Sequence, residues 1–182
     1  IDSYVRMLLA EAKGLSPEDR RQLERIQKNA SRLAHFVTSL LNTAKIERGS
    51  MEFHPKMCDL ARLVEDAALF QRSRAQEEGK TLVVELHPAL PRLSLDPDLM
   101  TQAITNLVSN AVKFTRRGGT VTVGLKRAPG WVECFVMDTG VGIASEAVKE
   151  LFKPFGQVKN NLSTVGTGLG LSIVKSLIEL HG

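Results

Sequence analysis

The chain has 182 residues, 43% hydrophobic and 24% charged, which is the composition of an ordinary globular protein and excludes a disordered or fibrous one. Its net charge is +4, and its 24 lysines and arginines are scattered, which argues against a nucleic-acid-binding protein. No stretch approaches the roughly 20 apolar residues of a membrane span, and no signal peptide is evident. The spacing of Cys58 and Cys134 fits no zinc motif, so we expect reduced thiols in a cytoplasmic fragment of a longer protein. Any membrane anchor is expected only in parts of that protein outside this sequence.

Residues 1–50 have the pattern of two helices. The first is expected to end at Gly14, and Ser16 as N-cap with Pro17 at the first helical position predicts the start of the second. The second helix carries a heptad seam formed by Leu23, Ile26, Ala30, Leu33, Val37, Leu40 and Ala44. Because a short hairpin cannot bury this seam alone, we predict a homodimer through residues 1–48 with a four-helix bundle. The alternative is a hairpin that packs on its own C-terminal domain.

Residues 51–182 have the mixed pattern of a second domain. Asp59 and Asp96 are expected to cap two of its helices. The expected helices cover 60–78, 97–114, 145–151 and 169–181, and the expected strands cover 81–87, 120–126 and 131–137. Because helices and strands do not alternate strictly, we predict a two-layer α/β sandwich with a mixed sheet covered by helices on one face, and an α+β chain overall.

Three polar residues fall on one strip of the predicted helix 97–114. Asn106, Asn110 and Lys113 are spaced i, i+4 and i+7, which places them within about 60° of one another on a helix. The strip is expected to border the core, as the wall of a cleft does. Amide oxygens suit Mg²⁺ and a lysine suits a phosphate group. The alternative is a solvated polar face.

The segment "DTGVGI" (138–143) directly follows a predicted strand. Asp138 could accept a hydrogen bond from an exocyclic amine such as that of adenine, and Gly140 and Gly142 would let a ligand approach the backbone. The alternative is a tight turn in which the aspartate caps its own loop.

The segment "GTGLGLSIVK" (166–175) places three glycines directly before a helix. It is neither a Walker loop nor a GxGxxG motif, but Gly166, Gly168 and Gly170 lead into a helix N-terminus, where free N–H groups suit a phosphate. The alternative is a flexible linker, which the immediate return of helical periodicity after Gly170 disfavours.

In this order, "NLVSNAVKFT", "DTGVGI", "LFKPFGQV" and "GTGLGLSIVKSLIELHG" resemble the N, G1, F and G2 boxes of sensor histidine kinases and, more widely, of the gyrase, Hsp90 and MutL ATPases. The resemblance implies an ATP-binding domain at 51–182 after a partial dimerization and phosphoacceptor hairpin at 1–50. It implies that Asn110 ligates Mg²⁺ with Asn106 beside it, that Lys113 reaches the phosphates and that Asp138 holds the adenine amine. The implied nucleotide-binding set is completed by Gly140, Gly142, Phe152, Phe155, Gly166, Thr167, Gly168, Leu169 and Gly170, with an ATP lid at 156–168.

The resemblance implies an enzyme, a protein-histidine kinase that uses Mg-ATP and passes phosphate from a histidine to the receiver domain of a response regulator. Asn106 stands where the ATP-hydrolysing relatives have a glutamate, which favours the kinase branch. The acceptor motif of the family is absent, so the acceptor histidine is expected upstream of Ile1, and the family's final β-hairpin is expected after Gly182. Two alternatives remain: a degenerate ATP-binding scaffold without kinase activity, and a serine-directed kinase of the anti-sigma type, which the heptad hairpin disfavours.

Overall fold

The computed structural model describes residues 2–11, 14–156 and 168–182. The chain divides into two compact units, residues 1–50 and 51–182.

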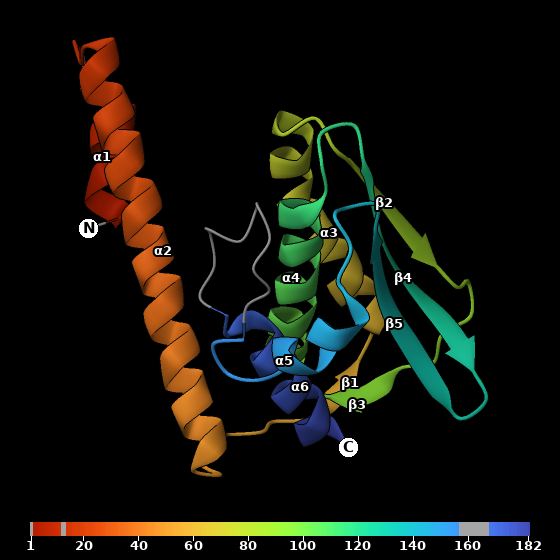
Figure 1. The fold of residues 1–182 in the computed structure, drawn as a ribbon. Helices are drawn as coiled ribbons and strands as arrows, with labels where there is room; N and C mark the ends of the chain where they lie inside the picture. Colours follow the sequence, from red (N-terminus) through yellow and green to blue (C-terminus); the bar gives the residue numbers. More distant parts are fainter. Residues whose placement is uncertain (1, 12–13, 157–167) are drawn as a thin grey trace. The chain divides into compact units, whose positions relative to one another are not determined.

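The first unit consists of two helices, α1 (Asp2–Glu11) and α2 (Pro17–Glu47), which lie side by side (Figure 1). The start of α2 is as predicted, because the Ser16 Oγ accepts a hydrogen bond from the backbone N–H of Asp19 at 3.1 Å. The heptad seam of α2 is largely open in the single chain, where Leu33 is 62% exposed and Leu40 is 44% exposed. The single chain therefore leaves apolar surface uncovered on this unit.

The second unit is built on a three-stranded mixed sheet in the order β2-β4-β5. β2 (Thr81–Leu86) runs parallel to β4 (Thr120–Ala128), and β4 pairs antiparallel with β5 (Trp131–Asp138). One face of this sheet packs against the helices α3 (Leu60–Glu77) and α4 (Pro97–Phe114), and α6 (Gly170–His181) packs on α4 (Figure 1). The predicted sandwich, with helices on one face of a mixed sheet, is confirmed for this unit.

Short elements complete the second unit. β1 (Lys56–Cys58) pairs antiparallel with β3 (Leu93–Leu95) in a separate two-stranded sheet, and β1 was not predicted. The predicted helix 145–151 is a short 3-10 turn, η1 (Ser145–Ala147), followed by a single α-helical turn, α5 (Val148–Leu151).

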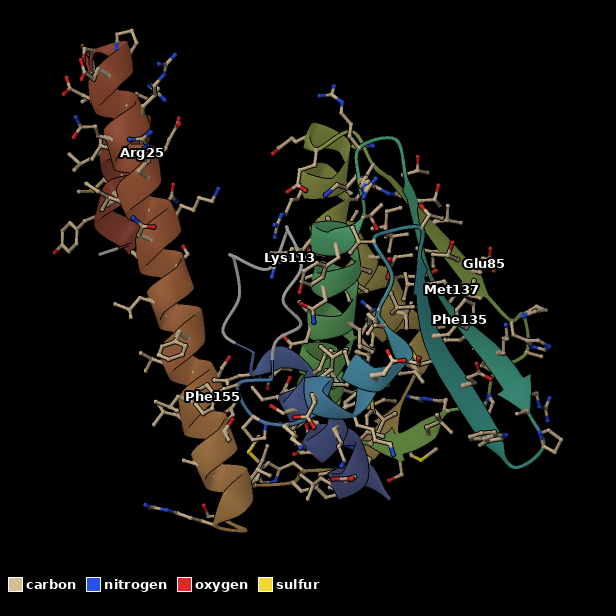
Figure 2. The ribbon with its side chains drawn as sticks, viewed as in Figure 1. Arg25, Glu85, Lys113, Phe135, Met137 and Phe155 are labelled. Atoms are coloured by element: carbon tan, nitrogen blue, oxygen red, sulfur yellow. The ribbon has the colours of Figure 1, made fainter. Side chains whose placement is uncertain are left out.

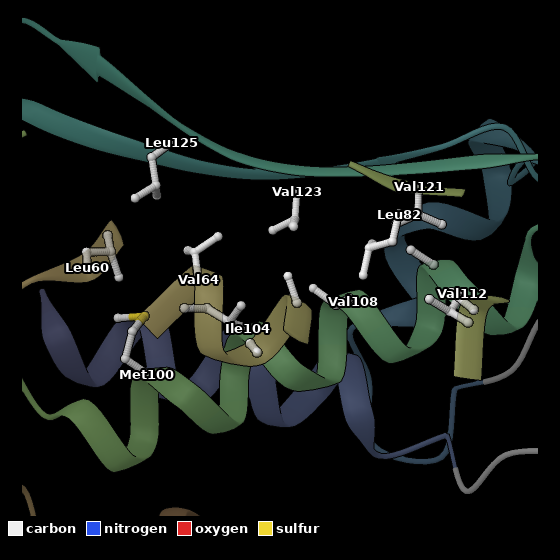
Figure 3. Close-up of a cluster of buried hydrophobic side chains, with 14 of the residues drawn as sticks. Leu60, Val64, Leu82, Met100, Ile104, Val108, Val112, Val121, Val123 and Leu125 are labelled. Atoms are coloured by element: carbon white, nitrogen blue, oxygen red, sulfur yellow. The ribbon is translucent and has the colours of Figure 1, made fainter. Parts of the chain in front are cut away.

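The core lies between the sheet and the helices (Figure 3). Alternate residues of β4 point inward, so Val121, Val123 and Leu125 are buried, as the period of two predicts. From below they meet Val64 of α3 and Ile104 of α4 (Figure 3). The thiol of Cys134 packs at the margin of this core, and burial raises its pKa to about 11, which keeps it protonated and inert.

The start of α4 is a hydrogen-bond centre that joins three segments. The buried Asp96 carboxylate caps α4 by accepting the N–H groups of Asp98 and Leu99 and also accepts that of His54 at 2.8 Å. Burial alone would raise the pKa of Asp96, but these three backbone hydrogen bonds outweigh it and hold the pKa below its ordinary value. The Nε2 of His181, at the end of α6, accepts the Asp96 N–H at 3.1 Å, so this histidine has a structural role.

On the other face of the sheet, an aromatic side chain packs directly on Gly124. The Phe135 ring lies over Gly124, where a Cβ would come within 2.5 Å of the Phe135 Cζ and 2.4 Å of the Glu85 carbonyl oxygen. The Lys126 Nζ sits 4.5 Å from the centre of the same ring, a cation–π contact. Figure 2 labels Glu85, Phe135 and Met137 on the strands of this sheet.

Candidate active site

Asn106, Asn110 and Lys113 form the strip of α4 that was predicted to line a cleft. Asn106 is more deeply buried than expected. Asn106 is 6% exposed, whereas Asn110 and Lys113 are half-buried. α6 packs on α4, and the spacing along α4 does not reveal this long-range contact. Within the described part of the chain, the Asn106 side-chain amide has no hydrogen-bond partner, and buried polar groups without partners are rare and costly. Such a group indicates a site that a ligand completes.

Asn110 lies beside the first turn of α6. A Cβ on Gly170 would come 3.6 Å from the Asn110 Nδ2, so the helix N-terminus and the amide are neighbours. Among the residues that the structure describes, no side chain caps the N–H groups at this end of α6, whose N-cap position is the fully buried Leu169. An uncapped helix N-terminus presents free N–H groups and the positive end of the helix dipole, which favours an anion. The predicted helix start near Leu169 is confirmed.

Lys113 projects from the C-terminal end of α4 (Figure 2). Its Nζ lies 4.3 Å from the centre of the Phe114 ring, which supports the ammonium group by a cation–π contact. A cation at this position suits a phosphate group.

The loop after β5 folds against the same end of α4. The Asp138 Oδ1 accepts the Gly140 N–H at 2.9 Å, so the tight turn considered from the sequence does form. It occupies only one carboxylate oxygen, and within the described residues no hydrogen bond reaches the Asp138 Oδ2. Thr139 fixes the loop to the sheet, because its Oγ1 accepts the Thr120 N–H at 3.0 Å.

Gly140 brings this loop to α4. A Cβ at this position would lie only 2.5 Å from the Phe114 carbonyl oxygen, so a residue with a side chain does not fit without movement. The close approach places Asp138 at the end of α4 that carries Lys113. Gly142 adopts a φ of +69°, and nothing lies within 4 Å of the Cβ that it lacks.

The predicted F-box residues lie on an exposed turn. Phe152 is 41% and Phe155 58% exposed, and Phe155 has a φ of +62°, a strained value for a residue other than glycine. A Cβ on Gly168 would come 2.7 Å from the Phe155 carbonyl carbon, so Gly168 is required for packing on this turn. Gly166 and Thr167, like most of the predicted lid 156–168, lie outside the described residues.

These groups fit Mg-ATP by their chemistry. Counting only the described residues, they are a buried amide without a partner, a helix N-terminus without a side-chain cap and a carboxylate with one oxygen that accepts no hydrogen bond. In the part of the chain that the structure describes, no three His, Cys, Asp or Glu residues cluster as a metal site, so a cation here needs amide and phosphate oxygens. No described helix is both long and apolar enough to cross a bilayer.

One residue of this region had no signal in the sequence. The Lys80 side chain is only 7% exposed, and its Nζ donates to the Val112 carbonyl oxygen of α4 at 2.6 Å. Only its place directly after Gly79 distinguishes it from the surface lysines, and that is too weak a pattern to use.

Comparison with known proteins shows which family has this architecture. The family described as "Histidine kinase-, DNA gyrase B-, and HSP90-like ATPase" matches residues 95–182. The "Non-motile and phage-resistance protein" of Caulobacter vibrioides is 40% identical over 162 residues, which cover 86% of this chain and 19% of that protein. The "Histidine protein kinase DivJ" of the same organism is 36% identical over 160 residues, which cover 87% of this chain and 27% of that protein. The chain thus spans less than a third of the length of these relatives.

Solved structures agree in fold. Full-length ShkA, crystallised with AMPPNP, has a TM-score of 0.76 and 29% identity over 97% of this chain and 37% of its own. ThkA in complex with the response regulator protein TrrA has a TM-score of 0.68 and 20% identity over 99% of this chain and 50% of its own, which shows the shared fold alone. The chain is therefore the catalytic ATPase core of a sensor histidine kinase with its preceding helical region, homologous to many two-component sensor kinases.

Proposed function

We propose that this chain binds Mg-ATP and transfers the γ-phosphoryl group to a histidine on a dimerization helix, from which it passes to an aspartate of a response regulator. The acceptor lies outside residues 1–182, because none of the four histidines present stands in the family's acceptor motif. The observation that carries the proposal is the buried Asn106 amide, which has no hydrogen-bond partner within the described residues and lies one turn before Asn110, the neighbour of the N-terminus of α6.

Each side chain has a positioning or charge-neutralising role in this proposal. Asp138 accepts the adenine amine through its Oδ2, and the first N–H groups of α6 with Lys113 hold the phosphates. Asn110 and Asn106 provide amide oxygens for Mg²⁺, which neutralises charge on the transferred group when it is bound.

The amide at position 106, in place of a carboxylate, favours transfer over hydrolysis. An amide cannot take a proton from water, so the site lacks a strong base where a hydrolytic enzyme needs one. We therefore expect slow hydrolysis of ATP and transfer to an imidazole held in line with the γ-phosphate. That AMPPNP was crystallised with ShkA supports a nucleotide in this site.

The helical unit supplies the dimer in this proposal. The exposed seam at Leu33, Val37 and Leu40 has the spacing of a bundle interface, and a second copy would bury it. That ThkA was crystallised with a response regulator supports a receiver domain as partner. A scaffold that binds ATP without kinase activity is the alternative, and the missing acceptor motif is its only support.

The test is phosphate transfer from γ-labelled ATP with Mg²⁺, on this chain and on a chain extended upstream to include the expected acceptor helix. We expect acid-labile, base-stable label on the extended chain alone, because phosphohistidine has this stability and phosphoserine does not. ATP binding by both chains with no label on either would favour the scaffold. Acid-stable label would favour a serine-directed kinase.

A further inference from the structure

The end of α4 is held by a lysine from another element. Because a helix has no intrahelical partner for its last four carbonyl groups, those of residues 111–114 need other donors. The Ala111 oxygen accepts the N–H and the Oγ1 of Thr115, at 3.0 and 2.7 Å. The Val112 oxygen accepts the Lys80 ammonium group at 2.6 Å. A cation at the C-terminus of a helix is also favoured by the helix dipole.

The Lys80 ammonium group is itself fixed in place. Its side chain is 7% exposed, and its second partner is the Glu78 carboxylate at 2.5 Å. Glu78 also accepts the Arg74 Nε at 3.0 Å. Burial would raise the pKa of Glu78, but the hydrogen bonds from Lys80 and Arg74 outweigh it and lower the pKa, so the carboxylate is charged near neutral pH. A buried ammonium group with two fixed partners is costly to disturb.

The backbone around Lys80 joins the same corner to the sheet and to the Asp138 loop. The Gly118 N–H donates to the Gly79 oxygen at 2.7 Å, and the Thr81 N–H donates to the Gly119 oxygen at 3.0 Å. Gly119 in turn packs closely on Thr139, since a Cβ there would lie 2.8 Å from the Thr139 Oγ1. Lys80 therefore lies where the end of α4, the start of β4 and the loop after Asp138 meet.

We propose that Lys80 is a positioning residue for the nucleotide: by holding the Val112 carbonyl it fixes the last turns of α4, and with them Asn110 and Lys113. This inference rests on the proposed function of the site. Lys80 touches no ligand in it, and acts through the helix end that carries the phosphate- and magnesium-binding groups. A displacement of these groups by about 1 Å can cost a hundredfold in rate, so a fixed helix end is of functional value.

The test compares AMPPNP binding with Mg²⁺ and thermal unfolding in four variants of the full chain. Lys80→Met keeps the apolar stem and removes the charge, and Lys80→Arg restores a cationic donor. Val64→Ala is the matched control, because it opens a cavity in the core at α3 and leaves the end of α4 untouched. Glu78→Gln removes the charged partner that fixes the Lys80 ammonium group beside the Val112 oxygen, so it loosens this contact without changing Lys80 itself.

We expect Lys80→Met to weaken AMPPNP binding about tenfold, Lys80→Arg to regain most of it, and Val64→Ala to bind like wild type despite a lower melting temperature. A purely structural role would lower the melting temperature of Lys80→Met and leave its affinity within twofold of wild type, which would overturn the inference. If Lys80→Met does not fold, Glu78→Gln decides: weaker binding supports the inference and unchanged binding overturns it. If wild type itself does not bind AMPPNP, the proposed function fails and this inference with it.

Discussion

The contact between Gly140 and the end of α4 leads to a quantitative prediction. In Gly140→Ala, the new Cβ would lie 2.5 Å from both the Phe114 carbonyl oxygen and the Asp138 Oδ1. An ordinary contact between heavy atoms is about 3.5 Å, so the loop has to retreat by about 1 Å. Overpacking of this kind costs about 1–3 kcal/mol of stability, and loss of the Asp138–Gly140 hydrogen bond about 1 kcal/mol more.

The retreat also moves Asp138, which we propose holds the adenine amine. A charged hydrogen bond that is lost or badly aligned costs about 1.5–3 kcal/mol, which corresponds to a rise of roughly 10- to 100-fold in Kd. The assay is titration calorimetry with AMPPNP and Mg²⁺, together with urea denaturation of the same protein.

The matched control is Gly124→Ala. Its Cβ would lie 2.4 Å from the Glu85 carbonyl oxygen, so the conflict with backbone is as severe, but it lies on the outer face of the sheet. Neither glycine has a positive φ, so both substitutions act by crowding alone. We expect both variants to lose stability and only Gly140→Ala to lose affinity. Equal loss of affinity in the two variants, or normal affinity in a destabilised Gly140→Ala, would refute the reasoning.

Three further predictions concern single residues. Asn106→Leu replaces a buried amide that has no partner among the described residues by an apolar group of similar size. We therefore expect the free energy of unfolding in urea to rise by about 1 kcal/mol while AMPPNP binding is lost. Because the pKa of Asp96 is lowered in the fold, its contribution to stability is complete above about pH 4 and is lost as the pH falls through the folded-state pKa. Asp96→Asn should therefore lower the melting temperature at neutral pH and reduce the drop in melting temperature between neutral and acidic pH. If the melting temperature of the variant falls with pH as steeply as that of wild type, the prediction is wrong. Leu40→Lys places a charge in the exposed seam and should convert a dimer into a monomer by light scattering, whereas an unchanged mass would exclude this face as the interface.

The helix starts could be predicted because their signals are local. Ser16, Asp59 and Asp96 each accept backbone N–H groups of the helix that follows, within two or three residues. The strands of the β4–β5 hairpin could be predicted for the same reason, because apolar and polar residues alternate along the sequence of β4. β1 was not predicted, because three residues are too few to show a period and the strand is defined by its pairing with β3.

What could not be predicted depends on contacts distant in sequence. Asn106 was expected to border the core, but it is buried, on a helix against which α6 packs from more than 60 residues later in the chain. Lys80 has the sequence context of an ordinary surface residue, yet its ammonium group is buried against a carbonyl 32 positions away. Spacing along one helix defines which side chains share a face, but the depth of each is set by the neighbouring element.

Two glycines of the candidate site, Gly140 and Gly168, are required by packing within the protein. From the sequence alone they were assigned to the approach of a ligand. In the structure, Gly140 is required by the Phe114 carbonyl and Gly168 by the backbone of Phe155, before any ligand is considered. Each glycine lets two segments of the chain pack more closely than a side chain would allow. This close packing positions residues that we propose bind the nucleotide. Substitution of these glycines should therefore lower stability together with affinity. Substitution of Asn106, which the fold does not need, should separate the two.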